Sequence, residues 1–218
     1  MTPRERALTS ALQTLEGELR AVSVDARNLR DTASKEAAER ALVALRASAD
    51  IAGGDEEVQL SAMLGRHELM QQLVIILGSK HAAFVSTALL CLQRLCAVAR
   101  FEPAAVAVAA GALVERTTGR ELPEPVQLKL LQTALHVAAA PDAPVDDAHA
   151  CELLRVCTAL HAAKSAAVRS TARAAVQQLI GFVLDAADAE RRAAERPTAG
   201  AGASGGAATS SGAHLSLI

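Results

Sequence analysis

Apolar residues recur every three or four positions along most of the chain, which is the spacing of one face of an α-helix. Glycine, proline and polar clusters interrupt this pattern and favour turns. Asp31 precedes one stripe as a candidate N-cap, and Gly78 follows another as a candidate helix stop. We therefore predict eight helices, whose apolar stripes cover residues 8–22, 37–45, 57–77, 84–98, 106–113, 128–138, 150–160 and 168–184. The last stripe is wide enough to bury against two neighbouring helices.

An internal repeat suggests how these helices are arranged. Segment 80–95 resembles segment 164–179 at an offset of 84 residues, and half of this offset is 42. The matched pairs include Lys80 with Lys164, Ser86 with Ser170, Thr87 with Thr171, Gln93 with Gln177 and Leu95 with Leu179. HEAT and armadillo repeats have periods of about 40–47 residues. The sequence thus predicts an all-α, armadillo/HEAT-like solenoid of about four helical hairpins. An irregular helical bundle with chance similarity is the alternative.

The composition changes near residue 196. Residues 198–212 contain only glycine, alanine, serine and threonine, and such a segment buries too little surface to offset its ordering entropy. We expect a folded domain over residues 1–195 and a flexible, disordered tail over residues 196–218.

Composition and charge narrow the classes of function. The chain has 22 basic and 24 acidic residues, a net charge of -2, and no tyrosine or tryptophan. Nucleic-acid binders usually carry a basic excess and stacking aromatics, so a nucleic-acid partner is not expected. No secretory signal or membrane-spanning run stands out, which favours a cytoplasmic location with membrane contact only through partners.

Metal and catalytic sites lack a sequence signature. None of the six histidines lies three or four residues from another histidine, and His161 with Cys157 supplies only two ligands. The four cysteines show no CxxC spacing and are interpreted as reduced thiols. Phosphate-loop, dinucleotide and serine-nucleophile motifs are absent, and Asp146 with Asp147 suits a helix N-terminus. We expect no catalytic residue, no cofactor and no metal ion. A helical enzyme with an unrecognised site is the remaining enzymatic alternative.

Candidate contact residues follow from the helical pattern. The apolar stripe of segment 84–98 turns neighbouring positions outward, and the same holds for segment 128–138. The predicted partner-binding residues are Leu89, Gln93, Arg94, Lys129 and Gln132. Leu89 is the most indicative, because an outward leucine beside polar neighbours is typical of an interface patch. Ordinary solvated side chains are the alternative for each of the five.

Three parts of the chain resemble a known family. They are residues 12–23, residues 35–46, and residues 153–157 together with 168–179. These segments resemble the N-terminal dimerisation and cyclophilin-binding (DCB) domain of the large Arf guanine-nucleotide exchange factors and of the Golgi monensin-sensitivity proteins. The last helix pair is more similar to the second group. The resemblance covers about residues 8–187 and is weakest between 100 and 150.

The resemblance implies a function in membrane traffic. It implies an armadillo-like fold, self-association, contact with downstream helical domains, and recruitment to Golgi or endosomal membranes by Arf-like small GTPases. The chain lacks the exchange domain with its catalytic glutamate, so exchange activity is not expected of it. A HEAT-type adaptor subunit of a cytosolic complex, without a role in membrane traffic, is the alternative function.

Overall fold

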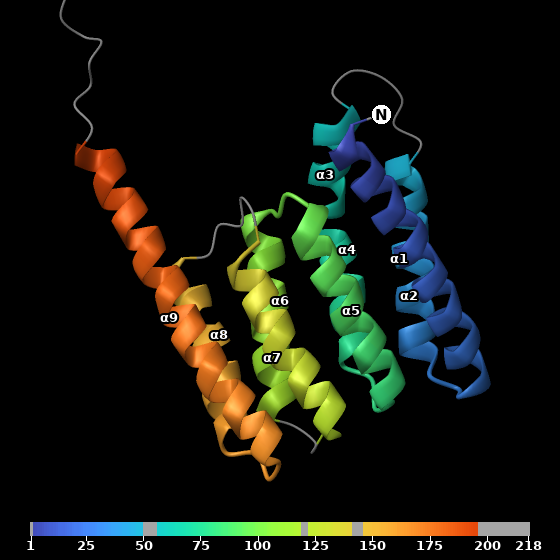
Figure 1. The fold of residues 1–218 in the computed structure, drawn as a ribbon. Coiled ribbons are helices and arrows are strands. Elements are labelled where there is room, and N and C mark those ends of the chain that lie inside the picture. The colour runs from blue at the N-terminus through green and yellow to red at the C-terminus, as the bar shows by residue number, and fades with distance from the viewer. Residues whose placement is uncertain (1, 50–55, 119–121, 141–145, 196–218) are drawn as a thin grey trace, which may run out of the picture. The chain divides into compact units, whose positions relative to one another are not determined.

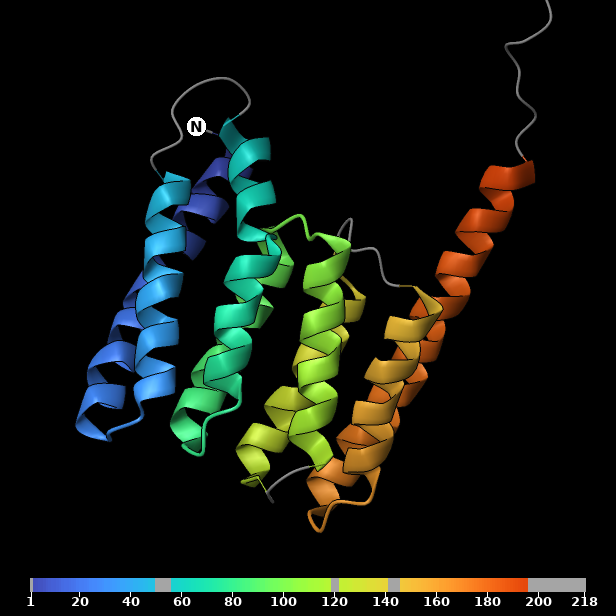
Figure 2. The same ribbon diagram turned by 180° about the vertical axis from the view of Figure 1, so that it is seen from behind.

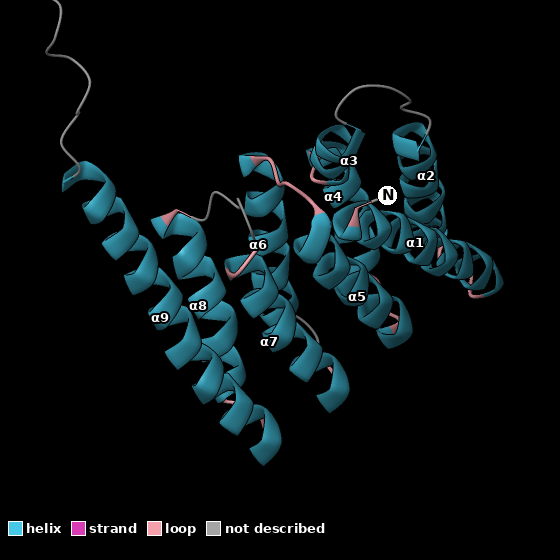
Figure 3. Cartoon of the chain, turned by 45° about the horizontal axis from the view of Figure 1, so that its top comes forward, coloured by secondary structure: helices cyan, strands magenta, loops and turns pink. Residues whose placement is uncertain are grey.

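The computed structural model describes residues 2–49, 56–118, 122–140 and 146–195. Within these ranges every regular element is an α-helix, as Figure 3 shows. The helices are α1 (Pro3–Asn28), α2 (Thr32–Ala49), α3 (Glu56–Leu64), α4 (His67–Leu77), α5 (Ala82–Val98), α6 (Pro103–Thr118), α7 (Glu124–Ala138), α8 (Asp147–His161) and α9 (Ala166–Glu195). The predicted all-α class is confirmed for the described residues.

The contacts divide the chain into two units, Met1–Val183 and Leu184–Ile218. Of the second unit the structure describes residues 184–195, which form the last part of α9. The predicted tail, residues 196–218, lies outside the described residues, and the predicted boundary at residue 195 stays a prediction.

The first unit is a stack of helical hairpins in two layers (Figures 1 and 2). In one layer α2, α4, α6 and α8 contact one another in that order, and in the other α1 contacts α5, which contacts α7. Each hairpin alone would leave an apolar face in water, and stacking buries it. This arrangement confirms the predicted armadillo-like stack. The matching segments 80–95 and 164–179 begin in the turns that lead into α5 and α9, two hairpins apart.

The order of the layers changes once along the chain. In the first hairpin α1 belongs to the layer of α5 and α7, and α2 belongs to the layer of α4. Both α2 and the next long helix, α4, therefore lie in the same layer. From α4 onward the chain alternates between the two layers, so only this later part follows one regular repeat.

Small side chains allow the helices to pack closely. The core consists mainly of leucine, alanine and valine, with Phe84 and Phe101 as its buried aromatic residues among those described. On α6 the buried positions include Ala105, Ala109 and Ala110. Alanine at a contact permits short distances between helix axes, which are about 8–10 Å in proteins.

The predicted helix over residues 57–77 is divided in the structure. It forms α3 and α4, which are separated at Gly65 and Arg66, so nine helices are described where eight were predicted. The reason lies in a distant segment that contacts Gly65. A Cβ atom on Gly65 would collide with the carbonyl of Arg100 and would lie 2.9 Å from the Cα of Phe101.

Backbone hydrogen bonds fix this crossing. The amide of Arg100 donates to the carbonyl of Ser61 at 3.0 Å, and the amide of Glu102 donates to the carbonyl of Gly65 at 3.1 Å. The hydroxyl of Ser61 also donates to the carbonyl of Val98 at 2.9 Å. The α5–α6 connection therefore occupies the carbonyl of Gly65, which a continuous helix would have used itself, and shares the carbonyl of Ser61 with the amide of Gly65.

A polar network joins the hairpin turns. Asp31 accepts hydrogen bonds from the amide of Ser34 at 3.1 Å and from the hydroxyl of Ser79 at 2.7 Å, which confirms it as the N-cap of α2. Arg116, near the end of α6, donates to the carbonyl of Ser79 at 2.8 Å. Asp31 and Ser79 thus link the α1–α2 turn to the α4–α5 turn, and Arg116 links the latter to α6.

The charge of Asp31 should contribute to stability at neutral pH. Burial by itself would raise the pKa of Asp31, but hydrogen bonds from Ser79 and Ser34 outweigh burial and hold the pKa below its ordinary value of 3.8. A lowered folded-state pKa adds stability that is present above pH 3.8 and is lost as the pH falls further.

We expect Asp31→Asn to lower the free energy of unfolding by about 1 kcal/mol at neutral pH. The difference from the wild type should shrink as the pH falls below 4, because the wild-type carboxylate then takes up its proton. Urea denaturation of both proteins between pH 7 and pH 3 measures this. A difference that stays constant over the whole range would show that the charge of Asp31 contributes nothing.

Candidate protein-interaction surface

The prediction that Leu89 faces outward is wrong. Its side chain is 0% exposed. The prediction assumed one apolar seam along α5, but α5 contacts α1, α4 and α7 and is therefore covered on three sides. A helix inside a layer has a much narrower outer face than a helix in an isolated hairpin, and Leu89 falls outside that face.

Gln93 and Lys129 are half-buried and connect α5 to α7. The amide nitrogen of Gln93 donates to the hydroxyl of Thr133 at 2.9 Å and lies 3.4 Å from the carbonyl of Lys129. The ammonium group of Lys129 donates in turn to the hydroxyl of Ser86. These side chains are held in place by the neighbouring helix, so any partner would meet them in fixed positions.

Arg94 connects α5 to α1. Its guanidinium group forms an ion pair with Glu18, and its side chain is 38% exposed. The thiol of Cys91 donates to the other carboxylate oxygen of Glu18 at 3.2 Å. Burial raises the pKa of Cys91 well above its usual value, and the negative charge of Glu18 raises it further, so Cys91 remains a protonated donor.

Of the five predicted contact residues, Gln132 is the one that is exposed and not half-buried or buried. Together with Gln93, Arg94 and Lys129 it lies on the layer formed by α1, α5 and α7. We call these four residues the polar row. Four of the five predicted residues therefore lie on helices of one layer, and their contact with a partner stays a prediction.

Exposed apolar residues on other helices were not among the predicted contacts. Val43 on α2 is 66% exposed and lines an open depression with Glu36, Glu39 and Arg40.

The stripe of α9 is buried at Val168 and Leu179 in the first unit, but Ile180 and Val183 are exposed. The prediction that this stripe is wide enough to bury against two neighbouring helices is therefore not met at its end, where these side chains remain exposed.

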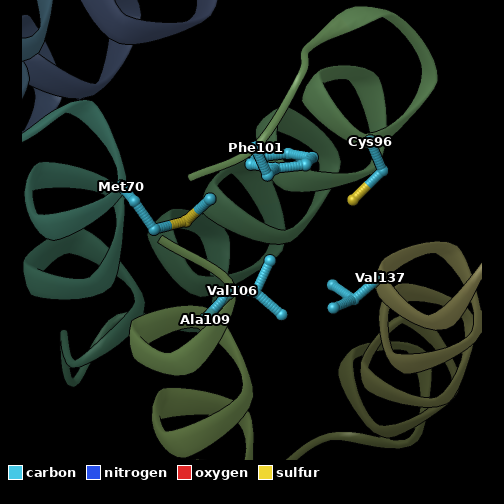
Figure 4. Close-up of a pocket in the computed structure, with 6 residues that line it drawn as sticks. All are labelled: Met70, Cys96, Phe101, Val106, Ala109 and Val137. Carbon is cyan, nitrogen blue, oxygen red and sulfur yellow. The ribbon is translucent and has the colours of Figure 1, made fainter. Parts of the chain in front are cut away.

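A small apolar gap lies in the core (Figure 4). It has a volume of about 10 Å³ and is lined by Met70, Cys96, Phe101, Val106, Ala109 and Val137. Such a gap holds a single water molecule at most. Burial raises the pKa of Cys96 to about 12, so this thiol is not a nucleophile at neutral pH. The gap is a packing feature and not a substrate site.

Groups that could bind a metal ion or cross a bilayer were also sought in the described part of the chain. Among those residues, no cluster of three or more histidine, cysteine, aspartate or glutamate side chains is placed to hold a metal ion. None of the described helices combines the length and apolar character needed for a membrane span.

Comparison with known proteins identifies the family. Residues 6–191 match the model of the DCB family, described as the Mon2/Sec7/BIG1-like dimerisation and cyclophilin-binding domain. A search of curated proteins finds no match. The family match covers most of the chain, including most of α1, helices α2 to α8 and most of α9. The chain therefore belongs to the DCB domain family, whose members are protein-interaction domains.

Proposed function

We propose that this chain is a non-enzymatic interaction and dimerisation module of a Golgi or endosomal trafficking scaffold related to the large Arf exchange factors. The observation that carries this proposal is the DCB family match over residues 6–191. The proposed location is cytoplasmic, at the periphery of Golgi or endosomal membranes. The proposed partners are a second copy, a cyclophilin, downstream helical domains and Arf-like small GTPases.

The surfaces of the stack support protein binding. In the polar row, Gln93, Arg94 and Lys129 are held by hydrogen bonds or an ion pair to neighbouring helices, which reduces the entropy lost on binding. The depression beside Val43 on α2 offers an exposed apolar side chain among charged ones, a common composition for an interface.

Self-association can be measured directly. Light scattering and sedimentation of the full chain at rising protein concentration should show the mass of a dimer. A chain that stays monomeric at the highest soluble concentration would contradict the dimerisation part of the proposal.

Capture of the chain by Arf-like GTPases should require their GTP-bound form, and equal capture by the GDP-bound form would contradict regulated recruitment.

The polar row can be tested in the same assays. Gln132→Arg adds a bulky charge at an exposed position and should weaken partner binding while leaving stability nearly unchanged. Gln178→Arg makes the same change at an exposed position on α9 and serves as the matched control. Equal binding by both variants and the wild type would exclude Gln132 from the interface.

A further inference from the structure

The hairpin turns of the first unit lie along one edge of the stack (Figures 1 and 2). This edge contains the α1–α2 turn, the α4–α5 turn, the last turn of α6 and the α8–α9 turn. We call it the turn edge and define it as residues 25–31, 78–81, 115–118 and 162–169. The hydrogen bonds among Asp31, Ser79 and Arg116 fix three of these segments relative to one another.

The turn edge is basic although the chain as a whole is slightly acidic. Its exposed basic residues are Arg27, Arg30, Lys80, Lys164 and Arg169, and Arg116 is half-buried. The acidic residues of the same segments are Asp25, Asp31 and Glu115, and the carboxylate of Asp31 is occupied by Ser34 and Ser79. Three of the four segments contribute at least one exposed lysine or arginine, so the positive charge is distributed along the row.

Some of this charge has a structural explanation. Arg27 and Arg116 lie in last turns of helices, where a basic side chain interacts favourably with the helix dipole. Arg169 donates to the carbonyls of Ala163 and Lys164. Arg30, Lys80 and Lys164 lie in the turns themselves, beyond the last helical residue, and the dipole explains them less well.

Arg30 supplies an independent observation. Its φ angle is 58°, in the left-handed region where glycine is strongly preferred. It follows α1 at the position where the amide of Asp31 bonds back to the carbonyl of Ala26 at 2.9 Å, a helix end that usually carries glycine. A charged, exposed side chain thus stands where the backbone favours glycine, so the backbone does not account for an arginine at this position.

We propose that the turn edge contacts an anionic lipid bilayer directly. Several basic side chains that are distributed over different turns match an extended anionic surface better than a compact ligand. Near such a surface each lysine or arginine strengthens binding by about fivefold. Direct lipid contact goes beyond the proposed function, in which partners alone bring the chain to the membrane.

The test uses the full chain and vesicles of two compositions. Vesicles of phosphatidylcholine alone are compared with vesicles containing about a third phosphatidylserine, by co-sedimentation at low and physiological salt. The test variant combines Arg30→Gly with Lys80→Gln, and the glycine relieves the backbone of residue 30. The control combines Arg66→Gln with Arg100→Gln, which removes two exposed charges from the opposite edge.

The wild type should bind the anionic vesicles, and salt should weaken this binding. The turn-edge variant should lose about 25-fold in affinity and the control should lose much less, with both proteins folded by circular dichroism. The proposal would be overturned if the wild type did not bind the anionic vesicles. It would also be overturned if neither salt nor the turn-edge substitutions reduced the binding, or if the control variant lost as much affinity as the turn-edge variant. Preferential binding to polyglutamate over the vesicles would assign the edge to an acidic protein instead. Light scattering and GTPase capture use no lipid, so their outcomes are independent of this one.

Discussion

Replacing Gly65 by alanine is expected to lower the free energy of unfolding by about 3 kcal/mol. The added Cβ would collide with the backbone carbonyl of Arg100, and a backbone atom cannot move aside as the end of a long side chain can. Relief requires the α5–α6 connection to shift, which would break the hydrogen bond from the amide of Glu102 to Gly65. Urea denaturation monitored by circular dichroism measures the loss.

Gly111→Ala is the matched control. Gly111 lies within α6, and nothing lies within 4 Å of the position that its Cβ would take. Alanine is a better helix former than glycine by about 1 kcal/mol, so this variant should be slightly more stable than the wild type. If Gly65→Ala were as stable as Gly111→Ala, the crossing of residues 100–102 over Gly65 would be incorrect.

Most helix positions could be predicted from the sequence, because the spacing of apolar residues and the local end signals act over a few residues. Asp31 was identified as a cap because its side chain serves the amide three positions later. Gly78 was identified as a stop, and α4 indeed ends at Leu77. Local chemistry of this kind needs no knowledge of the packing.

The break between α3 and α4 could not be predicted in the same way. The apolar pattern continues through residues 57–77. Gly65 by itself does not end a helix, because a glycine inside a helix lowers its stability by only about 1 kcal/mol relative to alanine. The helix is interrupted because the backbone of Arg100 and Phe101, far along the chain, occupies the space beside Gly65. Such a contact follows from the stacking of hairpins and leaves little trace in either local segment.

The candidate surface could be predicted only in part, because it also depends on contacts between distant segments. Polar positions on α5 and α7 could be assigned to the outer face from periodicity, and Gln93, Arg94 and Lys129 remain partly exposed. The ion pair of Arg94 with Glu18 and the hydrogen bond of Gln93 to Thr133 could not be predicted, because they depend on which helices are neighbours within a layer. The layer order is itself irregular at α1 and α2, where the internal repeat gave no guidance.

We expect Leu89→Ala to lower the free energy of unfolding by about 3 kcal/mol. The leucine is fully buried on a helix that contacts three others, so its removal leaves a cavity that rigid neighbours fill poorly. If Leu89 instead lay on an outer face beside Gln93, the loss would be below about 0.5 kcal/mol. Urea denaturation of this variant therefore distinguishes a buried Leu89 from an outward-facing one.

Leu184→Ala makes the same chemical change at a side chain that is 62% exposed. It should alter the free energy of unfolding by less than about 0.5 kcal/mol, since little buried surface is lost and alanine favours the helix. Equal stability of the two variants would contradict the burial of Leu89. A large loss for Leu89→Ala alone would show that α5 is an internal helix of its layer, and that a partner can meet α5 only along the narrow strip that holds Gln93 and Arg94.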